Sequence, residues 1–101
     1  MAVRYETTLK VNETTIDLNE FAHEYVTRIV LCAVSMLKGG TEVKELVYTM
    51  DGNKTALVIN NKPVPLSAFP RDALLGTFTG VASSLRGVNQ INKLTIQMKV
   101  V

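Results

Sequence analysis

The chain has 101 residues, of which 47% are hydrophobic and 20% are charged, and its formal net charge at pH 7 is +2. This length and composition predict one globular domain, and a charge this small is not by itself typical of a nucleic-acid-binding protein. No cleavable leader follows Met1, and the longest apolar run, residues 29–34, is far shorter than the roughly 20 residues of a membrane span. We therefore expect a cytoplasmic protein with no membrane partner.

The first strand is predicted from alternation close to the N-terminus. Tyr5, Thr7, Leu9 and Val11 alternate with charged or polar residues, which is typical of a half-buried strand. The sequence Asn12-Glu13-Thr14 predicts a turn, because asparagine tolerates positive φ, and a short extended piece over 15–17 follows it.

A helix is expected next, from an N-cap at Asn19 to a left-handed C-cap at Gly39, over residues 20–38. A strand over 43–50 should close this first unit. Asp51-Gly52 then predicts a tight hairpin turn into the second half of the chain.

The second half repeats this series of elements. A strand precedes the turn at residues 60–62, and the short piece 63–65 carries two prolines, which favours an edge position. Ser67 is the predicted N-cap of a helix over 68–86 that ends at Gly87. A last strand is expected over 91–100.

The two halves also share residues at a constant spacing of 48 positions. Residues 5–50 and 53–98 contain ten identical pairs without a gap, including Asn12 with Asn60 and Phe21 with Phe69. We interpret the chain as a single domain, 1–101, that arose by gene duplication. Its two tandem repeats should cover about 3–50 and 51–101.

The order strand, helix, strand, hairpin, strand, helix, strand predicts an α+β two-layer sandwich made of two pseudo-symmetric β-α-β repeats. The sheet should be antiparallel with both helices on one face. This order resembles the ferredoxin-like fold over nearly the whole chain. The resemblance is topological, and it implies no function.

The helices differ along the stripe beside their predicted sheet-facing side. We assign Val26, Val30, Ala33 and Leu37, and their equivalents in the second helix, to the sheet. The neighbouring stripe is bulky in the first helix and mostly small in the second. We therefore expect Cys32 and Ile29 to pack over Gly80, so that Gly80→Leu would destabilise the protein by about 1–3 kcal/mol through overpacking.

Some apolar residues remain outside both stripes. They form the candidate self-association surface: Leu31, Val34, Leu75 and Ala82. A contiguous apolar patch of this kind usually marks an interface. We therefore expect a homo-oligomer, most simply a dimer, that acts as a non-catalytic structural or interaction module.

The uncovered face of the sheet is the second candidate surface. Its cations could hold phosphates without sequence preference: Arg4, Lys10, Lys54, Lys93 and Lys99. The predicted face has no aromatic side chain on which bases could stack, so nucleic acid is a possible but not a favoured partner. A third alternative is a small-ligand regulatory domain that uses the glycine loops after the helices.

Catalytic and metal sites are not indicated. Cys32 is expected in the core and His23 on the solvated side of its helix, so the two side chains should lie on opposite sides. His23 with Glu20 or Glu24 makes a weak ligand set for a metal. We therefore predict no catalytic residue, no metal site and no cofactor.

Overall fold

The computed structural model describes residues 4–37, 39–85 and 87–101. The chain forms a small α+β domain with a six-stranded antiparallel sheet and two helices. The elements in chain order are β1 (Tyr5–Val11), β2 (Thr14–Thr15), α1 (Glu20–Val34), β3 (Glu45–Asp51), β4 (Lys54–Ile59), β5 (Lys62–Pro63), α2 (Ala68–Ser83) and β6 (Lys93–Val100).

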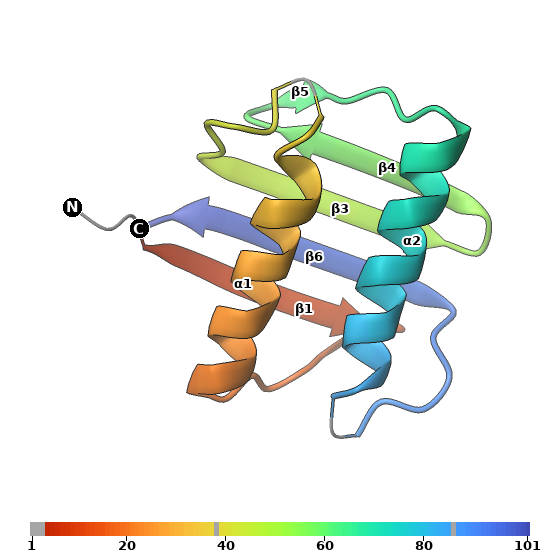
Figure 1. The fold of residues 1–101 in the computed structure, drawn as a ribbon. Helices are drawn as coiled ribbons and strands as arrows, with labels where there is room; N and C mark the ends of the chain where they lie inside the picture. The colour runs from red at the N-terminus through yellow and green to blue at the C-terminus, as the bar shows by residue number, and fades with distance from the viewer. Residues whose placement is uncertain (1–3, 38, 86) are drawn as a thin grey trace.

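The domain has two layers. Both helices run across one face of the sheet in opposite directions, and the other face carries no helix (Figure 1). The sheet order is β2-β1-β6-β3-β4-β5, with every neighbouring pair antiparallel. The prediction of an antiparallel sheet with both helices on one face is therefore correct.

The predicted ferredoxin-like strand order is wrong. The closing strands β3 and β6 lie side by side at the centre, and the opening strands β1 and β4 lie outside them. The turns that follow the opening strands give the physical reason. Asn12 and Glu13, with φ of 51° and 69°, fold β2 back onto the outer edge of β1, and Asn60 and Asn61, with φ of 53° and 66°, fold β5 onto β4. With one edge occupied in this way, β1 and β4 take the flanking positions.

Strand register follows the same 48-residue spacing as the sequence. Tyr48 on β3 lies opposite Ile96 on β6, exactly one spacing away along the chain. Val11 pairs with Leu94 on one side of the sheet, and the equivalent residues Ile59 and Leu46 pair on the other. The strand register therefore has a local two-fold axis that passes between Tyr48 and Ile96. The common ancestry of the two halves stays a prediction.

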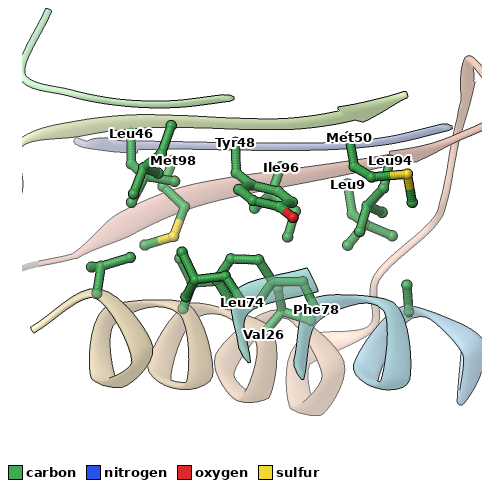
Figure 2. Close-up of a cluster of buried hydrophobic side chains, with 14 of the residues drawn as sticks. Leu9, Val26, Leu46, Tyr48, Met50, Leu74, Phe78, Leu94, Ile96 and Met98 are labelled. Atoms are coloured by element: carbon green, nitrogen blue, oxygen red, sulfur yellow. The ribbon is translucent and has the colours of Figure 1, made fainter. Parts of the chain in front are cut away.

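The core lies between the sheet and the helices (Figure 2). Tyr48 and Phe78 meet edge to face near its centre, with ring centroids 4.8 Å apart. Around them pack alternate residues of the four long strands and one stripe of each helix, including Leu9, Leu57, Val26 and Leu74. The alternation predicted for the first strand is confirmed, because Thr7, Leu9 and Val11 are buried and Tyr5 is half-buried.

Both helices end earlier than the sequence predicts. α1 stops at Val34 and α2 at Ser83, and the predicted ends at 38 and 86 lie outside the described residues. Serine hydroxyls compete for the last helical carbonyls, because Ser35 Oγ donates to Cys32 O and Ser83 Oγ donates to Gly80 O. Gly39 and Gly87 do adopt left-handed φ of 86°, but in the turns beyond the helices.

The helix starts agree with the sequence to different degrees. Asn19 caps α1 as predicted, since its Oδ1 accepts a hydrogen bond of 2.8 Å from Ala22 N. Ser67 occupies the N-cap position of α2, yet its side chain makes no capping hydrogen bond. The start of α2 therefore lacks the local stabilisation that α1 has.

Two equivalent asparagines connect the halves of the domain. Asn12 Oδ1 accepts from Asn92 N and Lys93 N, at 2.8 and 2.9 Å, and its Nδ2 donates to Gln90 O. Asn60 makes the corresponding three bonds to Lys44 N, Glu45 N and Glu42 O. Each asparagine thus holds the chain that enters the closing strand of the other half.

Candidate functional site

The predicted self-association surface is not a surface in this fold. Val34 and Ala82 are fully buried, with 0% of each residue exposed. Leu31 and Leu75 are partly buried and pack against the core. The expectation that Val34 and Ala82 stay exposed is wrong because both helices are rotated from the predicted orientation. α1 directs Val26, Val30 and Val34 at the sheet, where we expected Ala33 and Leu37 to follow Val30, and α2 directs Leu74, Phe78 and Ala82 at it.

This rotation turns the bulky stripe of α1 outward. The exposed fractions are 76% for Phe21, 49% for Tyr25 and 87% for Met36, and Cys32 is exposed as well. We call these four residues the α1 ridge, although Met36 lies in the turn just after the end of α1. The rings of Phe21 and Tyr25 stack on each other, with centroids 5.9 Å apart and planes 15° apart. The prediction that Cys32 belongs to the core is therefore wrong.

The matching side of α2 is exposed but small. Ala73, Gly76, Thr77 and Gly80 all face solvent, and we call them the α2 small stripe. A Cβ atom placed on Gly80 would meet nothing within 4 Å. The hypothesis that Cys32 and Ile29 pack over Gly80 is wrong, because both stripes point away from the sheet and the helices make few contacts with each other.

One large aromatic side chain lies at the start of α2. Phe69, the equivalent of Phe21, is 81% exposed. Both helices thus present an exposed phenylalanine in their first turn, on the layer that covers the sheet (Figure 1). The outer surface of the helical layer therefore combines the α1 ridge, the α2 small stripe and Phe69.

A hollow of about 560 Å³ adjoins the α2 small stripe. Its lining includes Gly76, Gly80, Leu75 and Thr79 of α2, and it continues to Asp51, Gly52, Ile91 and Asn92. Arg28 and Cys32 stand at the positions in α1 that correspond to Gly76 and Gly80, so the second half lacks the side chains that the first half carries here. Thr79 Oγ1 is buried beside this hollow and has no hydrogen-bond partner.

The two helices also differ in the ion pairs that their charged side chains form. Glu24 on α1 accepts a hydrogen bond of 2.6 Å from Arg28 Nε, one turn further along the helix. The corresponding pair in α2 is Asp72 with Gly76, so Asp72 has no cation in that position. Arg71, its neighbour, approaches it at 3.4 Å. Because these groups are exposed, the pairs contribute little to monomer stability.

The uncovered sheet face carries the predicted cations, all exposed, but carboxylates separate them. Lys99 lies across from both Glu6 and Glu45 in the strand register. Lys93 Nζ lies 3.5 Å from Glu13 and 3.9 Å from Asp51. Lys54 pairs in register with Asp51, and Arg4 and Lys10 lie towards the other edge. Within the described strands, this face carries no aromatic residue and no continuous row of cations.

His23 does not lie on the solvated side of α1, and that prediction is wrong. Its Nε2 accepts a hydrogen bond of 3.1 Å from Thr7 N on β1. Beside it, the hydroxyls of Thr7 and Thr27 are 2.6 Å apart, and Thr27 Oγ1 donates to His23 O. This cluster joins α1 to the part of the β1 edge that β2 does not cover. His23 therefore satisfies an edge amide that would otherwise be open.

Burial changes the acidity of Tyr48. Its hydroxyl is buried without a hydrogen-bond partner, and burial raises the pKa of Tyr48 from 10.0 to about 12. The ring lies between the sheet and the helices (Figure 2). The site lies in the core, so it offers no route for a substrate.

Metal binding and membrane insertion are two further functions on which the described residues bear. No group of three or more histidine, cysteine, aspartate or glutamate residues in this part of the chain is placed to hold a metal ion. No helix among the same residues is long and apolar enough to cross a membrane. For the small-ligand alternative, a hollow of about 560 Å³ lies beside Leu37, Gly39 and Lys62.

The exposed aromatic residues of the helical layer are thus the most prominent feature of the described surface. Sequence reasoning identified the bulky and the small stripes but placed them inside the molecule. Comparison with protein-family models, with curated proteins and with solved structures found no match to this chain.

Proposed function

We propose that this protein is a non-catalytic interaction module that self-associates through the outer surface of its helical layer. The observation that carries the proposal is the exposure of Phe21, Met36 and Phe69, each more than three-quarters exposed, on that layer. Tyr25, half exposed, extends the same surface. This surface replaces the one predicted from the sequence.

Large apolar side chains have a lower free energy when they are buried than when they are exposed to water. Burying one large apolar side chain is favourable by about 1.5–3 kcal/mol. Aromatic residues and methionine are enriched at protein interfaces, and tyrosine is frequent among the residues that contribute most to binding. Three aromatic residues and one methionine on one layer therefore favour a protein partner over open solvent.

Sedimentation velocity across a concentration series tests the proposal. We expect a concentration-dependent dimer for the natural sequence. The double variant Phe21→Ser with Met36→Ser should shift it to monomer while keeping the circular dichroism spectrum of the fold. Val101→Ser is the matched control, because Val101 is 69% exposed but lies at the C-terminus, and it should leave the dimer unchanged.

Nucleic-acid binding on the sheet face remains the alternative, with weaker support. Lys93 and Lys99 lie beside carboxylates, which oppose phosphate binding. Fluorescence anisotropy with a labelled single-stranded oligonucleotide separates the two proposals. We expect no binding at about 50 mM salt, and binding that weakens as salt is raised would favour the nucleic-acid function.

A further inference from the structure

We infer that the partner is a second copy of this chain, docked so that α1 of each copy lies on α2 of the other. This inference rests on the self-association proposed above and specifies its geometry. A two-fold axis parallel to the helices, running between α1 and α2, generates the arrangement. Phe21 and Tyr25, the N-terminal part of the α1 ridge, then face the α2 small stripe of the other copy.

The direction of the axis follows from the shapes of the two helices. α1 and α2 run antiparallel within one layer (Figure 1). A face-to-face dimer can have its axis along the helices, which places α1 on the partner's α2, or across them, which places α1 on α1. The second choice brings Phe21, Tyr25 and Met36 of both copies against each other. The first packs bulky side chains against glycine and alanine, as close packing requires.

The alignment along the helices follows from the local symmetry of the core. Val26 and Leu74 are 48 residues apart and both lie beneath Tyr48 (Figure 2). In the dimer, Val26 of one copy then lies at the same height along the helix axes as Leu74 of the other copy. Because the two helices are antiparallel, the N-terminal half of α1 lies over the C-terminal half of the partner's α2. Phe21 and Tyr25 of one copy thereby meet Gly76, Gly80 and the adjoining hollow of the other.

Charge agrees with this alignment. Arg28 lies two residues after Val26, and Asp72 lies two residues before Leu74, so the antiparallel crossing brings them to the same level. Both side chains are exposed in the monomer, and Asp72 lacks the arginine that its equivalent Glu24 has one turn away. The two-fold axis repeats the pair, so the interface gains two complementary contacts at its rim.

The available area suits a dimer. The domain measures 34 × 32 × 18 Å, and the helical layer covers one of its two broad faces. A stable interface needs about 800 Å² from each partner. The broad face is large enough to supply this area.

Gly80→Leu tests the packing of ridge on stripe. Nothing lies within 4 Å of a Cβ at Gly80, so leucine does not overpack the monomer and should improve its helix. In the dimer, leucine occupies the space that the partner's aromatic rings need. We expect Gly80→Leu to raise the dissociation constant of the dimer at least about tenfold. Ala56→Leu, on the exposed sheet face, should leave this constant unchanged. A Gly80→Leu dimer as tight as the natural one would overturn the inference.

Disulfide trapping tests the alignment without removing any aromatic residue. Cys32 is the only cysteine and is exposed, and the crossing places it level with Ala68 of the partner. On mild oxidation, Ala68→Cys should give a covalent dimer whose linked peptides join position 32 to position 68. The natural chain and the double variant Cys32→Ser with Ala68→Cys are the controls, and neither should link.

The outcomes separate the two proposals. Linkage between positions 32 and 68, together with weakening by Gly80→Leu, supports the inference. A dimer in which Cys32 links to Cys32 of the other copy, or in which neither variant has an effect, overturns the geometry but keeps self-association. A natural chain that stays monomeric overturns both.

Discussion

Tyr48 and Ile96 lie opposite each other on the two central strands and mark the local two-fold axis of the sheet. The strand registers, the asparagine bonds and the buried stripes repeat around this axis. The outer helical surface departs from it, because Gly76 and Gly80 replace Arg28 and Cys32. These two differences affect no core residue, so they favour a role at the surface and agree with the proposed self-association.

Replacing Tyr48 with phenylalanine should stabilise the protein. The Tyr48 hydroxyl is buried and unpaired, so its removal should recover about 1 kcal/mol of desolvation energy at neutral pH. Tyr5→Phe is the matched control, and it should change the free energy of unfolding in the opposite direction. Tyr5 Oη donates a hydrogen bond of 2.7 Å to Val43 O, and losing it should cost about 1 kcal/mol. Urea unfolding measures both changes, and a Tyr48→Phe variant less stable than the natural chain would show that the hydroxyl has a partner.

The same residue predicts a loss of stability at alkaline pH. Burial raises the pKa of Tyr48 from 10.0 to about 12, so above pH 10 the unfolded chain ionises this group before the folded chain does. Below pH 10 the ionisation of Tyr48 does not change the free energy of unfolding, and this free energy falls as the pH rises from 10 towards 12. Tyr48→Phe should therefore lose less stability than the natural chain between these values. Parallel stability curves for the two proteins over this window would contradict the assignment.

Asn12 and Asn60 should be equivalent in their contribution to stability. Asn12→Ala removes the acceptor for two backbone amides and places alanine at a φ of 51°, which together should cost about 2 kcal/mol. Asn60→Ala should cost a similar amount because its three bonds correspond. Asn12→Asp keeps the acceptor oxygen and should cost less than alanine. Thermal and urea unfolding measure the series, and an aspartate variant as unstable as the alanine variant would contradict this explanation.

Two glycines should respond to alanine in opposite directions. A Cβ at Gly40 would overlap Val34 O, so Gly40→Ala must displace backbone and should destabilise the protein by about 3 kcal/mol. Gly80 meets nothing within 4 Å, so Gly80→Ala should stabilise α2 by about 0.5–1 kcal/mol through helix propensity. Unfolding at a concentration below dimer formation separates these effects from association. A destabilised Gly80→Ala monomer would show that Gly80 is packed after all.

The strands and helices could be predicted because their signals are local. The alternation of residue types with a period of two identified the first strand, and Asn19 identified the start of α1. Strand order could not be derived in this way, since it depends on pairing between residues far apart in the chain. The positive φ of Glu13, which helps to place β2 on the outer edge of β1, was also not indicated by residue type alone.

The candidate surface was misplaced because apolar residues surround most of α1. The stripe of Val26 and Val30 can be continued at helical spacing in two ways, either by Ala33 with Leu37 or by Val34. The periodicity therefore permitted two orientations of α1 about its axis. The structure selects the rotation that buries Val34. The four-residue spacing of three valines, at 26, 30 and 34, was a signal for this choice.

Sedimentation velocity of the unmodified chain over a wide concentration range tests the central claim most directly. Association through the helical layer predicts a reversible monomer–dimer equilibrium, with Phe21→Ser and Met36→Ser together favouring the monomer. A single species with the mass of one 11.1 kDa chain at every concentration, up to the limit of solubility, would contradict it.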